Sequence, residues 1–186
     1  PPPLPPSTAA SDVYKRQGIL RERVKRLILV EGLGPLSQPA EKVTELMRDS
    51  IQQWNSLKTK KSPVYQNREE AVRARHFAGK LKKSSVETLV ARGLGENTDG
   101  LVWRSDPRLR IKSRLYLSEA QILQMIQDIT AHVLVIEAED TDTRRWVDLL
   151  RSRLGYVKNL DHRILPGGHH LHLDCLLYTS PSPRDT

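Results

Sequence analysis

Several features that would point to particular protein classes are scarce in this sequence. Cys175 is the only cysteine, which excludes an internal disulfide and a two-cysteine metal or redox motif. Aromatic residues make up 5% of the chain. No apolar run approaches the roughly 18 residues that a membrane-spanning helix needs. We therefore expect no disulfide, no membrane span and no cofactor, and a cytoplasmic location.

Charge is plentiful but mixed in sign. The 30 Lys and Arg residues outnumber the 22 Asp and Glu residues, for a formal net charge of +8. The basic residues are interspersed with acidic ones, and no basic run is longer than the pairs Lys60-Lys61 and Lys82-Lys83. This pattern is typical of a solvated basic surface, so we expect no nucleic-acid partner; the oligomeric state is left open.

The two ends of the chain lack the patterning of the rest. Residues 1–17 and 175–186 hold seven of the twelve prolines and the single cysteine. Residues 12–17 are encodable by a DNA whose reverse complement, read in a shifted frame, gives residues 175–180. Such an inverted pair resembles translated sequencing-library adapter, which has to be set aside before fold reasoning. We expect both tails to be non-native and the natural part, cut at both ends, to span 18–174.

Three short apolar runs predict buried strands. They cover 24–30, 131–136 and 157–165, and Gly and Pro end the first and third. Residues 143–154 carry apolar side chains at helical spacing between the second and third runs. The second run, 131–136, is continuous rather than alternating, which is typical of strands covered by helices on both faces. Strand, helix, strand predicts an α/β fold with a mostly parallel sheet.

About a hundred residues separate the first two strands, far more than a crossover helix requires. Apolar spacing predicts helices in this insertion, with an irregular segment over 100–110. Ser84 with Glu87, and Ser118 with Gln121, fit capping boxes at helix starts. The predicted organisation is a core strand and loop (18–35), a helical cap with its return to the core (36–130), and core strands with the site loops (131–174). The predicted cap helices cover 40–57, 69–82 and 84–92.

Polar residues follow each predicted strand at the edge where ligands bind in open α/β sheets. Glu31 follows the first strand, Asp140 the second, and His169 follows Gly167-Gly168 after the third. An acid and then a distant histidine match the end of the order Ser, Asp/Glu, His found in α/β-hydrolases. The Gly-x-Ser-x-Gly motif that would carry the serine does not occur in the chain.

Six further segments stand along the chain in a recognisable order: Arg26–Pro35, Glu70–Arg75, Leu89–Gly93, Gly100–Leu109, His132–Ile136 and Leu165–His172. Together they resemble the serine hydrolase-like group of α/β-hydrolases. The resemblance implies the C-terminal part of an α/β-hydrolase fold, with a cap inserted after the sixth core strand and hydrolysis by a Ser, acid, His triad. An acid after that strand also occurs in some haloalkane dehalogenases, whose nucleophile is an aspartate.

The triad acid has two candidate positions. Glu31 lies between an apolar strand and Gly-Leu-Gly-Pro, and from there its carboxylate would accept the Nδ1 proton of the histidine. Asp140 is the competitor, because many α/β-hydrolases carry their acid after the next strand in a Gly-x-x-Asp turn. The turn here has Thr141 in the place of that aspartate, and Asp142 is a further alternative.

His169 is the candidate general base, because a neutral imidazole is able to take a proton from the nucleophile and return it to the leaving group. Zinc binding by His169, His170 and His172 is the alternative, although no placed carboxylate accompanies them. We expect no metal, and a role for His172 in bracing the loop.

Other residues are assigned to the pocket or to the scaffold. Apolar pocket wall is expected from Leu33, Leu36 and Leu101, and Trp103 is a candidate for the substrate entrance. Arg104, Asp106 and Arg108 favour an internal salt bridge, and Trp54 and Trp146, at helical spacing, are expected in the core.

Three functions remain open. The leading one is hydrolysis of an ester-like small molecule, with the nucleophile outside this sequence, so that the chain alone is inactive. A dehalogenase or epoxide hydrolase with an Asp nucleophile is the first alternative. A non-catalytic binding protein is the second, because a fold does not fix a function.

Overall fold

The computed structural model describes residues 24–57, 62–79, 81–141 and 144–174. The predicted tails, 1–17 and 175–186, lie outside these ranges. The chain divides into two compact units, of which the first holds the described residues up to Ile51 and from Lys112 onward. The second unit, Gln52–Ile111, is narrower than the predicted cap of 36–130.

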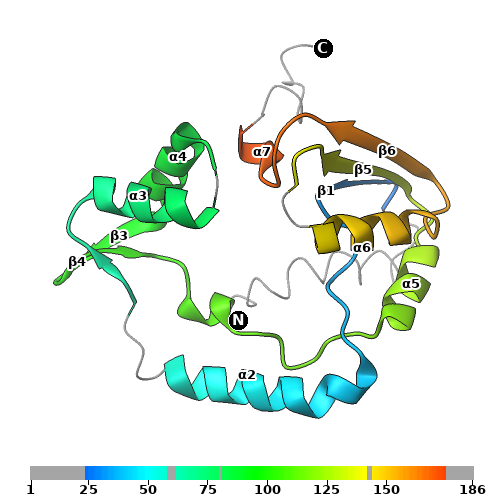
Figure 1. The fold of residues 1–186 in the computed structure, drawn as a ribbon, viewed down its shortest axis with the longest axis horizontal. Helices are drawn as coiled ribbons and strands as arrows, with labels where there is room; N and C mark the ends of the chain where they lie inside the picture. The colour runs from blue at the N-terminus through cyan, green and yellow to red at the C-terminus, as the bar shows by residue number, and fades with distance from the viewer. Residues whose placement is uncertain (1–23, 58–61, 80, 142–143, 175–186) are drawn as a thin grey trace. The chain divides into compact units, whose positions relative to one another are not determined.

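A three-stranded parallel sheet forms the centre of the first unit (Figure 1). Its order is β1-β5-β6, with Val30 opposite Ile136 and Ala138 opposite Leu165. The carboxyl ends of all three strands therefore meet at one edge of the sheet. The strands are those predicted from the apolar runs: β1 (Arg26–Val30), β5 (His132–Ala138) and β6 (Leu160–Leu165).

Helices connect these strands, as the sequence predicts. The capping box that starts α5 is confirmed, because the Ser118 hydroxyl accepts from the Gln121 N–H while the Gln121 side chain accepts from the Ser118 N–H. The helical elements that lie wholly or partly in the first unit are η2 (Ala40–Lys42), α2 (Val43–Leu57), α5 (Glu119–Gln127), α6 (Arg144–Leu154) and α7 (Leu171–Asp174).

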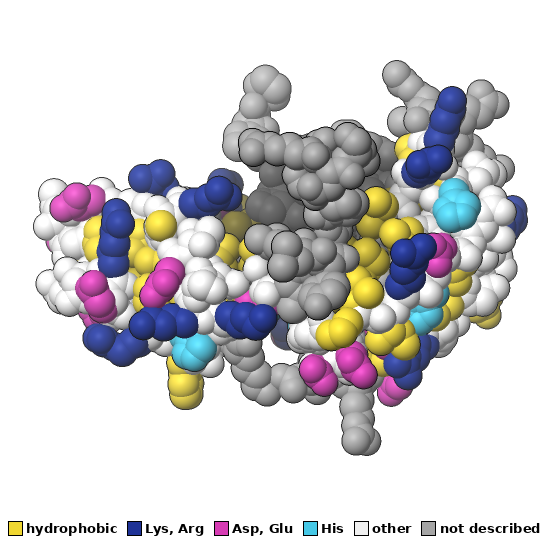
Figure 2. All heavy atoms as spheres, turned by 90° about the horizontal axis from the view of Figure 1, so that it is seen from above, with side chains coloured by type: hydrophobic (Ala, Val, Ile, Leu, Met, Phe, Trp, Pro, Cys, Tyr) yellow, Lys and Arg dark blue, Asp and Glu magenta, His cyan; other side chains and the backbone are white. Residues whose placement is uncertain are grey.

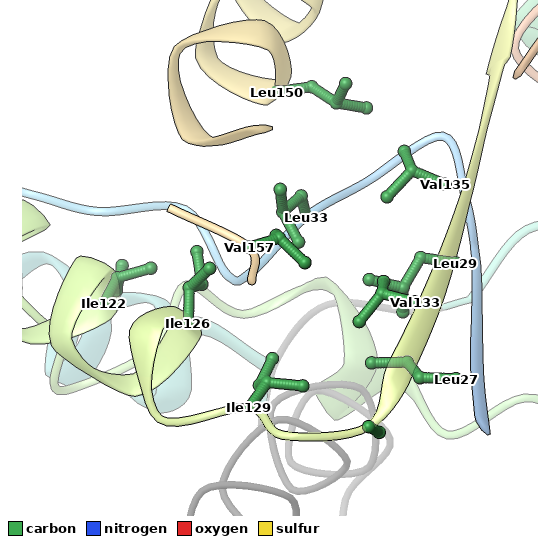
Figure 3. Packing of buried hydrophobic residues seen from close by; sticks show 11 residues of the cluster. Leu27, Leu29, Leu33, Ile122, Ile126, Ile129, Val133, Val135, Leu150 and Val157 are labelled. Atoms are coloured by element: carbon green, nitrogen blue, oxygen red, sulfur yellow. The ribbon is translucent and has the colours of Figure 1, made fainter. Parts of the chain in front are cut away.

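The core of the first unit lies between the sheet and helices α5 and α6 (Figure 3). Alternate residues of β1 and β5 point to this side, because successive side chains of a strand face opposite ways. The other face of β5 packs against α7, where Leu171 is fully buried. Ile28 of β1 is 64% exposed, so β1 is buried on one face only in the described part of the chain. The core residues include Leu27, Leu29, Leu33, Ile122, Ile126, Ile129, Val133, Val135, Leu150 and Val157.

The second unit is not purely helical. It has an antiparallel sheet of order β2-β4-β3 beside α3 and α4. The predicted irregular segment 100–110 was wrong at its start, because 100–103 form a strand of this sheet. The elements are β2 (Val64–Tyr65), α3 (Arg68–Gly79), α4 (Lys83–Gly93), β3 (Leu94–Asn97), β4 (Gly100–Trp103) and η3 (Pro107–Arg110).

Local hydrogen bonds explain this hairpin and correct one predicted cap. The Asn97 side chain accepts from the backbone N–H groups of Asp99 and Gly100, which stabilises the turn between β3 and β4. The capping box proposed at Ser84 was wrong. Helix α4 begins at Lys83, with Lys82 at the N-cap and no side-chain hydrogen bond there.

Lys and Arg side chains are scattered among Asp and Glu on the face shown in Figure 2, in agreement with the mixed charge of the sequence. The described ranges contain no helix that is long and apolar enough to cross a membrane.

Candidate active site

Glu31 is the first residue after β1, and its side chain is buried although it carries a carboxylate. Its backbone has a φ of +57°, the left-handed region that few non-glycine residues adopt. The Glu31 N–H donates to the Ile136 carbonyl at 2.8 Å, which continues the β1–β5 pairing by one residue. Oε1 accepts from the Ala138 N–H at 2.5 Å. These contacts hold the Glu31 backbone and one oxygen of its carboxylate at the edge of the sheet.

Arg153 holds the loop that follows Glu31. Its buried guanidinium donates to the carbonyls of Leu33, at 2.7 Å, and Pro35, at 2.9 Å, and to the Glu119 carboxylate. The guanidinium lies against Gly34, where φ is +86° and an added Cβ would come within 3.0 Å of Nη1. The Arg153 hydrogen bond lowers the pKa of Glu119 below its ordinary value, against a smaller opposing effect of burial.

His169 stands on the loop after β6 and faces Glu31. Gly167, with a φ of +127°, supplies the turn before it, as the glycine pair suggested. Nδ1 of His169 is 2.9 Å from Oε2 of Glu31. An ionised carboxylate only accepts hydrogen bonds, so Nδ1 carries the proton and Nε2 of the neutral ring has a free lone pair. The His169 side chain is 50% exposed, and Nε2 has no hydrogen-bond partner among the described residues.

Among the described residues of the segment after β5, a threonine and not an acid is hydrogen-bonded to this pair. Thr141 Oγ1 donates to Oε2 of Glu31 at 2.6 Å. Asp140 is exposed, and its backbone N–H donates to the Gly167 carbonyl at 3.0 Å, while its carboxylate is not in contact with His169. Asp142 lies outside the described residues. The structure thus brings Glu31 to the histidine, and not Asp140.

Trp146 of α6 is a site residue that the sequence reasoning assigned to the core. Its indole Nε1 donates to the Glu31 carbonyl at 2.5 Å, and its ring meets the ring of His169 edge to face at 6.4 Å. A hydrogen bond to a carbonyl 115 residues away leaves no local pattern in the sequence. Trp54, also expected in the core, is 38% exposed on α2.

The predicted pocket residues lie in different places. Leu33 is buried in the hydrophobic core of the sheet, so its side chain contacts the scaffold and not an open pocket. Leu36 is 47% exposed. Leu101 and Trp103 are on β4 in the second unit, where the Trp103 indole donates to the Tyr65 hydroxyl at 3.4 Å.

Asp106 and Arg108 form a salt bridge within their segment, between exposed side chains, and the hydrogen bond from Arg108 lowers the pKa of Asp106. In the described ranges, no three His, Cys, Asp or Glu side chains are grouped as metal ligands would be.

A second buried glutamate, which the sequence analysis did not single out, also contacts a histidine. Glu137 of β5 has a side chain that is 2% exposed. Its carboxylate accepts from Arg151 Nε at 3.0 Å and Nη2 at 2.6 Å, and it lies 3.0 Å from Nε2 of His162. The Glu137 carboxylate in turn raises the pKa of Arg151.

The geometry at Glu31 is what general-base chemistry requires. A carboxylate fixes the imidazole in one tautomer, and the opposite nitrogen remains available for a proton. Among the described residues, no Lys or Arg is hydrogen-bonded to Glu31, so its charge is available to stabilise the imidazolium form of His169.

No family model matches the chain. A serine hydrolase-like protein from Dictyostelium discoideum is 26% identical over 165 residues, which cover 81% of this chain and 45% of that protein. The crystal structure of a hypothetical protein from Pseudomonas aeruginosa PAO1 is 34% identical, with a TM-score of 0.75 over 85% of this chain and 56% of that one. The chain thus spans about half the length of these relatives.

A more distant structure supports the same fold. The thioesterase domain from the curacin biosynthetic pathway is 19% identical, with a TM-score of 0.69 over 88% of this chain and 59% of that one. The order of the parallel sheet, with Glu31 and His169 at its carboxyl edge, agrees with these similarities. The chain therefore has the α/β-hydrolase fold and is similar to serine hydrolase-like proteins.

Proposed function

We propose that the whole protein hydrolyses an ester-like small molecule by acyl transfer, with His169 as its general base and Glu31 as the acid that supports it. The observation that carries this proposal is the 2.9 Å contact between Nδ1 of His169 and Oε2 of Glu31, on a histidine whose Nε2 is free among the described residues. The nucleophile, a serine, stands in a part of the protein outside this sequence.

In the proposed reaction Nε2 takes the proton of the serine hydroxyl as its oxygen attacks the ester carbonyl. The imidazolium that forms is stabilised by the Glu31 carboxylate through the Nδ1 proton. Nε2 then gives its proton to the departing alkoxide, which leaves an acyl-enzyme. Water, deprotonated by the same nitrogen, attacks the acyl group and regenerates the serine.

A dehalogenase or epoxide hydrolase is the second candidate, and the position of the acid favours it. Glu31 follows β1 and not β5, an arrangement that resembles some haloalkane dehalogenases. In that case an aspartate attacks carbon and forms an alkyl-enzyme ester, and His169 activates only the water that hydrolyses it. The carboxylate–imidazole pair would have the same geometry in both mechanisms, so the nucleophile separates them.

Labelling of the full-length protein tests the proposal. An alkyl fluorophosphonate should label one serine stoichiometrically, and p-nitrophenyl esters should be turned over. Halide release or epoxide opening, with ¹⁸O from water incorporated into an aspartate, would favour the second candidate. Absence of both activities would favour a binding protein. The 186-residue chain alone should turn over no ester, because it lacks the nucleophile.

A further inference from the structure

We infer that Thr141 is a positioning residue, whose hydroxyl holds the Glu31 carboxylate in the orientation that His169 needs. This inference deepens the proposed function and rests on it. Thr141 Oγ1 donates at 2.6 Å to Oε2 of Glu31, the same oxygen that lies 2.9 Å from Nδ1 of His169. One carboxylate oxygen thus joins the hydroxyl to the imidazole.

The need for such a residue follows from the other contacts of the carboxylate. Oε1 is held by the Ala138 N–H, but one hydrogen bond leaves the carboxylate free to turn about its last side-chain bond. Torsions of this kind have broad energy minima in glutamate, so packing or hydrogen bonds have to select the angle. The Thr141 hydroxyl supplies a second fixed point. It is also a neutral donor, so it leaves the negative charge of Glu31 available to His169, which an arginine in the same place would not.

Thr141 is itself tied to the loop that carries the histidine. The residues just before it, Glu139 and Asp140, donate their backbone N–H groups to the Leu165 carbonyl at 2.9 Å and the Gly167 carbonyl at 3.0 Å. Residue 167 stands two positions before His169. The hydroxyl, the carboxylate and the imidazole are therefore attached to neighbouring backbone segments, and a change in one is transmitted to the other two.

Replacement of the hydroxyl by a methyl group of similar shape tests the inference. In the full-length enzyme, Thr141→Val should lower kcat about tenfold, because it removes one typical hydrogen bond from groups that act in the reaction. KM should stay within about twofold, because the lost hydrogen bond acts on the reaction and not on substrate binding. Thr141→Ser keeps the hydroxyl and should restore most of kcat. Thermal unfolding of both variants would report any general loss of packing.

NMR of the Nδ1 proton of His169 gives a readout that does not depend on turnover. The proton should exchange with water faster, and its resonance should move upfield, in Thr141→Val but not in Thr141→Ser. Glu31→Gln is the matched control, and should alter the same resonance. An altered resonance in Glu31→Gln with an unchanged one in Thr141→Val would overturn the role of Thr141 alone. An unchanged resonance in both would overturn the pair and, with it, the proposed function. Equal loss of kcat in the valine and serine variants would reduce Thr141 to a packing residue.

Discussion

The first unit contains two buried glutamates that each contact a histidine, and their surroundings differ. Glu137 also accepts two hydrogen bonds from Arg151, so its charge is already neutralised by a guanidinium. Glu31 accepts from a threonine hydroxyl and a backbone N–H, and within the described ranges no cation other than a protonated His169 is paired with it. Contact between an acid and a histidine is therefore not enough to mark a catalytic pair. In the part of the chain that the structure describes, the two pairs differ in the competing cation, which Arg151 supplies at Glu137 and no Lys or Arg supplies at Glu31.

The largest expected effects are on turnover by the full-length enzyme. Glu31→Gln should lower kcat by roughly 10⁴-fold, because an amide supports the imidazolium poorly. His169→Ala should lower kcat at least as far, and the double variant should be scarcely worse than His169→Ala, since residues that act as one unit are not additive. Steady-state kinetics on a p-nitrophenyl ester would measure this.

The matched controls come from the other pair. Glu137→Gln and His162→Gln should leave kcat within a few-fold of the wild-type value. A collapse of turnover in these variants, with normal turnover in His169→Ala, would reverse the roles of the two pairs.

Stability should show the opposite ranking. Glu137→Gln should reduce the free energy of unfolding by about 2 kcal/mol, because it replaces the buried carboxylate that accepts hydrogen bonds from Arg151 with a neutral amide. Glu31→Gln should cost less than about 1 kcal/mol, since the amide oxygen still accepts from the Ala138 N–H. Urea denaturation of each variant beside the wild type checks the ranking, and equal losses would contradict the comparison.

The carboxylate of Glu119 should make the stability of the fold depend on pH. Glu119 has its pKa lowered by the hydrogen bond from Arg153, so it stabilises the fold above the ordinary pKa of a glutamate and loses this contribution as the pH falls through the lowered value. The stability difference between wild type and Glu119→Gln should therefore shrink from pH 6 toward pH 3. A constant difference over that range would contradict the pairing. The effect should be small, because the Glu119 side chain is 37% exposed.

The smallest effect is expected at Asp140. Asp140→Asn should leave kcat within about twofold, because its exposed carboxylate does not contact His169 and only its backbone is used. A loss comparable to that of Glu31→Gln would move the acid to the segment after β5.

The elements that could be predicted from the sequence are those with strong periodicity. The apolar runs predicted all three strands of the parallel sheet, and the spacing of Ser118 and Gln121 predicted the start of α5. The hairpin at 94–103 was missed because Leu-Gly-Glu-Asn has neither an apolar run nor strict alternation. Its strands are fixed by pairing with each other and with Val64 and Tyr65, which lie far away in the sequence.

The same limit applies to the candidate site. Glu31 and His169 were found because each follows a recognisable strand, and their contact follows from the parallel order of those strands. Trp146 and Thr141 were not given a role, because each acts through one hydrogen bond to a residue more than a hundred positions away. Helical spacing predicted only that Trp146 would be buried, and a threonine in a turn has many possible partners.

The left-handed backbone of Glu31 has a consequence for protein engineering. A φ of +57° costs a residue with a β-carbon on the order of 1 kcal/mol, whereas glycine adopts it freely and asparagine does so more readily than most residues. Gly or Asn at position 31 would relieve this backbone cost, but either would discard the carboxylate, and glycine would also leave the Ala138 N–H without its acceptor. Consensus or stability-guided redesign of this fold should hold that position fixed, since what is unfavourable for the backbone there is what keeps the acid beside its histidine.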